Sequence, residues 1–190
     1  MPAASPLRIL IVCTANICRS PMAEVLVADC LAARDVAATV GSAGFLAGGQ
    51  PASDAAIQVM AERGLDLSHH RSREVTPELV HEADLVLTME RRHARDLVVN
   101  AGEATPVHTM KGFLRLAASV PPRAGDTAGW LADVAAAAHR ESLLGDGQTD
   151  EIADPHGRPI AVHRRTADEI AAAAGALGVL LAGAARERRR

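Results

Sequence analysis

The sequence predicts an α/β protein, in which helices alternate with the strands of a parallel sheet. The apolar run LRILIV at residues 7–12 is typical of a buried strand, and strand-like runs recur at 36–44 and 84–89. Each run is followed by residues that typically start a helix, and such alternation indicates a parallel sheet. With 190 residues, 48% of them hydrophobic, the chain is long enough to bury one core. We therefore expect a single domain over residues 1–190.

The strands are predicted from short runs of apolar and β-branched residues that end at glycine or polar residues. Because aromatic residues make up only 2% of the chain, the core must consist mainly of alanine, leucine, valine and isoleucine. In chain order, the predicted strands are residues 7–12, 36–44, 84–89 and 105–110.

The helices are predicted from the signals at their ends. Ser20 suits the N-cap of the first helix, with Pro21 at its first position. The second helix runs from Ser53 to Arg63, because Gly64 suits the position just past a helix end. The remaining predicted elements are a short helix or turn at 76–78, a helix from near 91, a loop at 119–129, a helix at 131–144, a loop at 145–159 and a C-terminal helix.

Composition argues against several classes of protein. A net charge of −3 disfavours a general nucleic-acid or anionic-membrane binder, and the basic residues at 185–190 are interpreted as a solvated helix end. The longest apolar stretches are alanine-rich and interrupted by charge or glycine, so no transmembrane helix is expected. No secretory leader pattern is present, and three cysteines do not make a disulfide framework. A reducing, cytoplasmic setting is expected.

The decapeptide VCTANICRSP at residues 12–21 follows the first predicted strand directly. In such folds ligands bind beyond the carboxyl ends of the strands, and a loop that leads into a helix can point its N–H groups at an anion. The guanidinium of Arg19 matches phosphate with two parallel hydrogen bonds. The sequence therefore predicts a phosphate cradle built from Thr14, Ala15, Asn16, Ile17, Cys18, Arg19 and Ser20.

Cys13 is expected at the base of this cradle. Positive potential there favours the thiolate, which is a nucleophile in line with a bound phosphorus atom. Ser20 can donate its hydroxyl to that thiolate, and Asn16 tolerates the left-handed backbone of a tightly wound loop. The alternative, that Cys13 is only a small buried hydrophobic residue, is disfavoured by the strand before the loop and the helix after it.

The decapeptide resembles the signature of the low-molecular-weight protein tyrosine phosphatases, which usually reads Cys-x-Gly-Asn-Ile-Cys-Arg-Ser-Pro. Further similarities occur in the same order along most of the chain. They are Ser42-Ala43-Gly44, SHHRSR at 68–73, LTMERRH at 87–93 and Asp154-Pro155.

The resemblance implies a three-layer sandwich with a four-stranded parallel sheet flanked by helices on both faces. It implies hydrolysis of phosphate monoesters through a phosphocysteine, without a metal or other cofactor. Cys13 would be the nucleophile, Arg19 would bind phosphate and stabilise the transition state, and Asp154 would be the general acid and then the base. From the residues alone, Asp154 is equally consistent with a turn or capping role.

The sequence departs from the family pattern around the predicted pocket. Ala15 replaces the usual glycine, which costs about 1 kcal/mol if that position has positive φ. The predicted pocket wall consists of Phe45, Leu46 and His156, without the aromatic residues that many members use. This wall resembles that of bacterial members that act on autophosphorylated tyrosine kinases, so a phosphotyrosine protein is the expected substrate. The protein itself is expected to be a monomer or weak dimer. Residues 117–150 are predicted to be a helical insertion.

The other cysteines and the histidines have separate interpretations. Cys18 lies close enough in sequence to capture an oxidised Cys13 as a reversible disulfide, which the family resemblance also implies; alternatively, it packs inward. Cys30 is interpreted as a packing residue. None of the eight histidines falls into a recognisable metal-ligand motif.

Two other functions stay open at this point. An arsenate reductase would share the fold and Cys13, and it would use an external thiol or Cys18, because no cysteine follows Cys30. A non-catalytic phosphate-binding module is the second, and the presence of Cys13, Arg19 and Asp154 argues against it. A nucleotide-binding loop is disfavoured because the chain has no Gly-x4-Gly-Lys-Ser/Thr pattern.

Overall fold

The computed structural model describes residues 5–101, 106–141 and 150–186. It contains a four-stranded, fully parallel sheet whose strands lie in the order β2-β1-β3-β4. This confirms the predicted α/β class and its parallel sheet. The strands are β1 (Leu7–Cys13), β2 (Ala38–Gly44), β3 (Leu85–Thr88) and β4 (Val107–Thr109).

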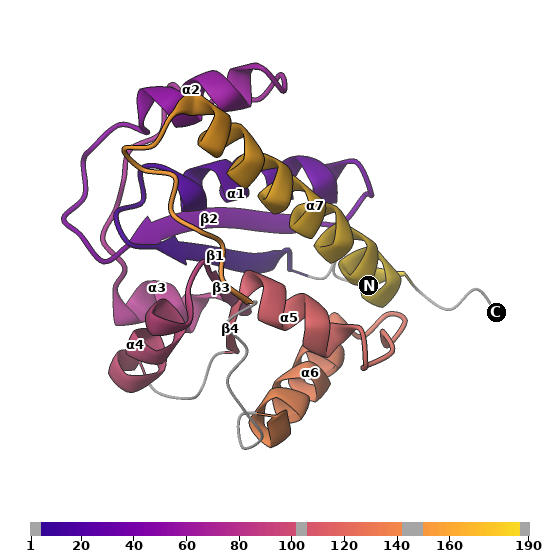
Figure 1. Cartoon of the computed structure of the whole chain (residues 1–190). Helices are drawn as coiled ribbons and strands as arrows, with labels where there is room; N and C mark the ends of the chain where they lie inside the picture. The colour runs from indigo at the N-terminus through magenta and orange to yellow at the C-terminus, as the bar shows by residue number, and fades with distance from the viewer. Residues whose placement is uncertain (1–4, 102–105, 142–149, 187–190) are drawn as a thin grey trace.

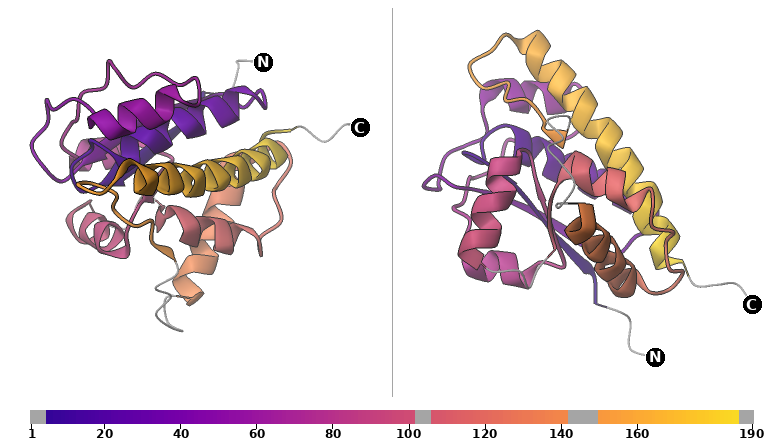
Figure 2. Two further views of the ribbon diagram at one scale, coloured as in Figure 1. Left: turned by 45° about the horizontal axis from the view of Figure 1, so that its top comes forward. Right: turned by 60° about the horizontal axis from the view of Figure 1, so that its bottom comes forward.

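Helices cover both faces of the sheet and give it three layers (Figures 1 and 2). One face carries α1 (Arg19–Ala32), α2 (Asp54–Ala61), α5 (Met110–Ala117), α6 (Thr127–Glu141) and α7 (Ile160–Ala185). The other carries α3 (Pro77–Glu82) and α4 (Arg91–Ala101).

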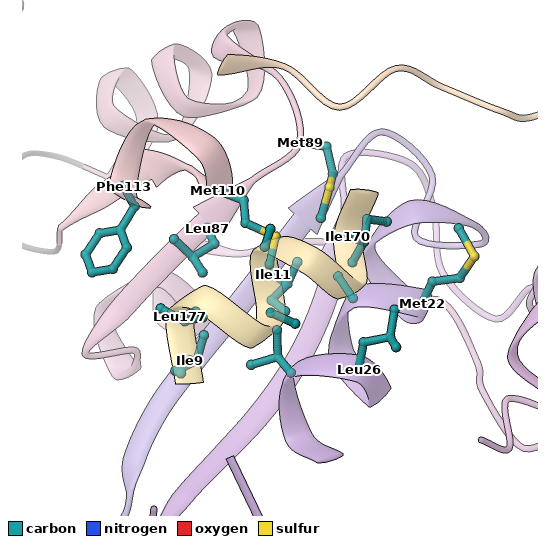
Figure 3. Packing of buried hydrophobic residues seen from close by; sticks show 14 of the residues in the cluster. Ile9, Ile11, Met22, Leu26, Leu87, Met89, Met110, Phe113, Ile170 and Leu177 are labelled. Carbon is teal, nitrogen blue, oxygen red and sulfur yellow. The ribbon is translucent and has the colours of Figure 1, made fainter. Parts of the chain in front are cut away.

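The two faces of β1 build the two halves of the core. Ile9 and Ile11 point into the larger cluster, which also contains Met22 of α1 and Ile170 of α7 (Figure 3). Leu10 and Val12 point the other way, into a smaller cluster under α3 and α4. Because both faces of a central parallel strand are buried, its sequence is a continuous apolar run rather than an alternating one.

Several helix ends follow their predicted capping residues. The Ser53 hydroxyl accepts a hydrogen bond from the Ala56 N–H at the start of α2, and the Thr76 hydroxyl accepts one from Leu79 at the start of α3. Gly64 has φ +75°, as expected beyond a helix end.

Ser20, in contrast, does not cap α1. The helix begins at Arg19, and the N-cap position is Cys18, whose side chain makes no capping hydrogen bond. The prediction was wrong because the Ser20 hydroxyl is engaged by Cys13 and Asn16 instead.

The predicted 131–144 helix begins earlier than expected, and α5 was not predicted. Helix α6 starts at Thr127, where the Asp126 carboxylate accepts a hydrogen bond from the Gly129 N–H; residues 142–149 lie outside the described ranges. Helix α5 follows β4 without a loop, and the Thr109 hydroxyl accepts from the Gly112 N–H. That the 117–150 segment is an insertion stays a prediction.

The C-terminal helix α7 is long and apolar enough to cross a membrane by length and composition. Half of its apolar window is buried inside the structure. Its buried positions, among them Ile170, Ala174, Leu177 and Leu181, recur at helical spacing on the side that packs against the core. The absence of a membrane-spanning segment therefore stays a prediction.

Candidate active site

The predicted phosphate loop lies at the carboxyl edge of the sheet. Strand β1 is central, with Cys13 beside Gly44 of β2 and Val12 beside Thr88 of β3. Residues 14–18 then lead into α1. Neighbouring strands on both sides thus border the loop, which is the position where parallel sheets bind ligands.

The loop is wound so that its carbonyl groups point outward. The Thr14 carbonyl accepts hydrogen bonds from the N–H groups of Phe45 (2.7 Å) and Leu46 (3.2 Å), and the Ile17 carbonyl accepts one from Ser53 (2.8 Å). Among the described residues, none accepts a hydrogen bond from the N–H groups of residues 14–18. A row of N–H groups without protein acceptors at a helix start is an anion-binding arrangement.

Asn16 holds this winding in place. It is fully buried and has φ +55°, in the left-handed region that asparagine tolerates. Its Nδ2 donates to the hydroxyls of Ser20 (2.9 Å) and Ser42 (2.7 Å), and its Oδ1 accepts from the Arg73 N–H (2.9 Å). Ala15 is not among the described residues with positive φ, so its β-carbon carries no left-handed strain.

Gly44 allows the end of β2 to approach the loop closely. A β-carbon built at this position would lie 2.7 Å from the Asn16 nitrogen and 2.9 Å from the Thr14 oxygen. Both are backbone atoms that cannot move without unwinding the loop. This contact explains why the motif Ser42-Ala43-Gly44 ends in glycine.

Cys13 and Ser20 face each other under the loop. The Cys13 Sγ is buried and lies 3.0 Å from the Ser20 Oγ, which is 3.4 Å from the Ala43 carbonyl oxygen. Because Asn16 donates to the same hydroxyl, the Ser20 hydrogen can point at the sulfur atom, 3.0 Å away, or at the more distant Ala43 carbonyl. The arrangement is suited to hold a thiolate through a serine hydrogen bond.

The guanidinium of Arg19 is held by three groups from two segments of the chain. It is only 1% exposed, and its Nη1 donates to Glu90 Oε1 (2.6 Å) and to the Ile152 carbonyl (2.9 Å). Its Nη2 pairs with Asp154 Oδ2 at 2.9 Å. The structure therefore brings Arg19 and Asp154, which are 135 residues apart in the chain (154 − 19), into direct contact.

Glu90 is a site residue that the sequence reasoning did not assign. Burial alone would raise the pKa of this carboxyl group, but hydrogen bonds from Arg92 and Arg19 outweigh it and lower the pKa below its ordinary value. An ionised Glu90 holds Nη1 of Arg19, whereas Asp154 pairs with Nη2. Its position in the LTMERRH motif was the sequence signal that could have indicated a role in the site.

The segment that carries Asp154 is anchored on its N-terminal side. The Ile152 N–H donates to the Met89 carbonyl (2.9 Å), and the buried Asp150 pairs with Arg115 of α5 (2.7 Å). Lys111, also on α5, donates to the Glu151 carbonyl (3.2 Å). Asp154 itself is 46% exposed, which is consistent with the predicted role of a general acid.

The predicted pocket wall is only partly assembled. Phe45 is half-buried, and its ring stacks on His93, with the ring centroids 5.3 Å apart. Leu46 is 54% exposed. His156 is exposed and donates its N–H to Asp154 Oδ1. His93, which was not predicted, places its Nε2 3.0 Å from Thr14 Oγ1, and burial lowers its pKa.

All three cysteines are free thiols in the structure. Cys18 is buried in the larger core cluster, and burial raises the pKa of its thiol to about 12. It is therefore a protonated thiol at neutral pH, and a disulfide with Cys13 stays a prediction. Cys30 lies against the same cluster, as expected of a packing residue. Within the described ranges, no group of three or more His, Cys, Asp or Glu residues could hold a metal ion.

Comparisons with known proteins agree on one family. A sequence profile described as "Low molecular weight phosphotyrosine protein phosphatase" matches residues 8–121. The chain is 44% identical over 90 residues to the probable low molecular weight protein-tyrosine-phosphatase EpsP of Ralstonia solanacearum, a match that covers 47% of the chain and 59% of that relative.

Two further similarities cover more of the chain. It is 33% identical over 167 residues to a protein-arginine-phosphatase of Geobacillus stearothermophilus, which covers 87% of the chain and 89% of that relative. The crystal structure of a low molecular weight protein tyrosine phosphatase from T. tengcongensis matches with a TM-score of 0.68 and 32% identity, over 90% of the chain and 97% of that structure.

Proposed function

The chain belongs to the low molecular weight phosphotyrosine protein phosphatase family, and from that premise we propose that it hydrolyses phosphate monoesters through a phosphocysteine on Cys13. The observation that carries the proposal is the buried Cys13 thiol beneath a loop whose N–H groups have no acceptor among the described residues. A tetrahedral anion is the ligand that such a loop binds. Both residues beside it, Arg19 and Ser20, have the chemistry that the reaction needs.

In the first step, the Cys13 thiolate attacks phosphorus, and the bond from phosphorus to the leaving oxygen breaks. Arg19 and the N–H groups of residues 14–18 hold the three non-bridging oxygens, where negative charge accumulates. Asp154, which pairs with Arg19 in the structure, is the general acid and carries the proton in the enzyme–substrate complex. It then donates that proton to the leaving oxygen.

In the second step, water attacks the phosphocysteine and the phosphorus–sulfur bond breaks. Asp154, now a carboxylate, accepts the proton of the attacking water, and inorganic phosphate leaves. The Ser20 hydroxyl, 3.0 Å from the sulfur atom, donates to the departing thiolate and makes it a better leaving group. Capture of an oxidised Cys13 by Cys18 would protect the nucleophile reversibly.

The proposed substrate is a phosphotyrosine protein, in particular an autophosphorylated bacterial tyrosine kinase. The similarity to EpsP, which is named a probable protein-tyrosine-phosphatase, supports a phosphotyrosine protein as the substrate. Phosphoarginine is the second candidate, because the relative that covers 87% of the chain is named a protein-arginine-phosphatase. The relatives, named as phosphatases, favour neither the arsenate reductase nor the binding module. We propose that the protein acts in the cytoplasm, as a single domain.

The experiment that tests this function is hydrolysis of p-nitrophenyl phosphate by the reduced protein, with Cys13→Ser as the control. We expect turnover in the wild type and none in the variant, while the variant still binds inorganic phosphate. Turnover that survives the substitution would overturn the covalent mechanism. Phosphotyrosine and phosphoarginine peptides, assayed side by side, identify the substrate class.

A further inference from the structure

Arg92 is a charged residue beside the phosphate loop that the proposed chemistry does not use. It lies in the first turn of α4, and its side chain is 61% exposed. Its Nε donates to Glu90 Oε2 at 2.6 Å, and its Nη2 donates to the Thr14 hydroxyl at 3.1 Å. Because two residues hold it, this guanidinium has already lost much of its rotamer freedom.

Contacts with two residues, and the charge of a third, place Arg92 at the solvent side of the site. Thr14, which it binds, follows Cys13 directly. Glu90, which it also binds, is shared with Arg19, so two guanidinium groups flank a single carboxylate. The hydrogen bond and charge of Glu90, and to a smaller extent the charge of Asp154, raise the pKa of Arg92. Arg92 therefore lies between the phosphate loop and the segment that carries Asp154.

Arg92 keeps hydrogen-bond donors that are available to a second anion. Arg19 pairs with both Glu90 and Asp154, whereas Glu90 is the one carboxylate among the described residues that pairs with Arg92. Among the described residues, none accepts a hydrogen bond from the Nη1 group of Arg92. A guanidinium with unused donors, held still and open to solvent, is suited to bind a carboxylate with two parallel hydrogen bonds.

We infer that Arg92 forms a second anion contact at the mouth of the phosphate site. It selects phosphoprotein segments that carry an aspartate or glutamate next to the phosphorylated residue. This inference rests on the proposed function, since it concerns the substrate of the same site. The net charge of −3 on the whole chain disfavours acidic peptides. A preference for them would therefore have to come from positive charge close to the site.

The test compares phosphotyrosine peptides that differ only at the positions before and after the phosphotyrosine, with aspartate or alanine there. We expect the wild type to prefer the aspartate peptide by about fivefold in kcat/KM, the upper range for an exposed ion pair. The preference should shrink as the ionic strength rises. Arg92→Gln should bring the ratio close to one.

Arg95→Gln is the matched control. Arg95 is exposed on the same helix, one turn further along, and removing it changes the net charge by the same amount. This variant should keep the preference of the wild type. A loss of preference in both variants would mean that only overall charge matters, which would overturn the inference.

Two further outcomes would also overturn it. If the wild type hydrolyses the aspartate and alanine peptides with equal kcat/KM, it has no second anion contact. If Arg92→Gln lowers kcat/KM equally for both peptides and leaves their ratio unchanged, Arg92 acts only by holding Glu90 and Arg19. The affinities of the two peptides for the Cys13→Ser variant, which does not turn them over, give the same comparison as a ratio of dissociation constants. Failure of the proposed chemistry, seen with p-nitrophenyl phosphate, is thus distinguished from failure of this inference.

Discussion

Asn16 offers the sharpest test of how the phosphate loop is held. Its side chain is fully buried, its backbone is in the left-handed region, and it bonds Ser20, Ser42 and the Arg73 N–H. Substitution to alanine removes these three hydrogen bonds and leaves a residue that adopts φ +55° poorly. Substitution to glycine removes the same hydrogen bonds but accepts that backbone conformation.

The expected losses follow from these contacts. Three buried hydrogen bonds contribute about 1 kcal/mol each to the free energy of unfolding, so both variants lose about 3 kcal/mol. Alanine loses about 1–2 kcal/mol more through left-handed strain. The unfolded chain of the glycine variant has greater conformational freedom, which destabilises this variant by about 0.5–1 kcal/mol and offsets part of that difference. Asn16→Gly should therefore be about 1 kcal/mol more stable than Asn16→Ala.

Urea unfolding at neutral pH measures this difference by linear extrapolation. Turnover of p-nitrophenyl phosphate by each folded variant reports whether the loop keeps its shape. If alanine proves as stable as glycine, positive φ at Asn16 is not a constraint. If both variants lose less than about 1 kcal/mol, the hydrogen bonds around Asn16 do not hold the loop.

Three further expectations concern the acid segment and the core. Asp154→Asn should slow hydrolysis of phenyl phosphate by about 10²–10⁴-fold and that of p-nitrophenyl phosphate less, because the better leaving group needs less protonation; equal effects would place the acid elsewhere. Asp150→Asn weakens the ion pair with Arg115 and should slow the acid-dependent step, while the rate of Cys13 alkylation by iodoacetate stays unchanged. Burial lowers the pKa of His108 to about 4, so the unfolded chain binds more protons below about pH 6.5. The free energy of unfolding of the wild type should then fall by about 2 kcal/mol between pH 7 and pH 5 through this group, as measured by urea unfolding. An equal fall in a His108→Gln variant would contradict the assignment to His108.

Local signals in the sequence account for the features that were predicted correctly. The apolar run of β1, the Ser53 and Thr76 caps and the left-handed Asn16 all depend on neighbouring residues or on intrinsic preference. Such signals are present in the chain before any tertiary contact forms.

The features that were missed depend on distant partners. Ser20 is a good capping residue by type, but Cys13 and Asn16 engage its hydroxyl in the folded protein. Glu90 acquires its role from Arg19, 71 residues away. Helix α5 was missed because it follows β4 without an intervening loop, although Met110, Phe113 and Leu116 have helical spacing.

The outward-facing hydrogen bonds of the phosphate loop tie its shape to the whole fold. Asn16 alone bonds to residues 26, 54 and 57 positions further along the chain. The loop therefore cannot open by itself, because β2 and the 70–73 segment would have to leave with it. Its opening free energy should approach that of global unfolding, as in the most protected part of a cooperative unit. The proposed catalytic loop is therefore expected to be as rigid as the core, and thermal inactivation and unfolding should then be a single event.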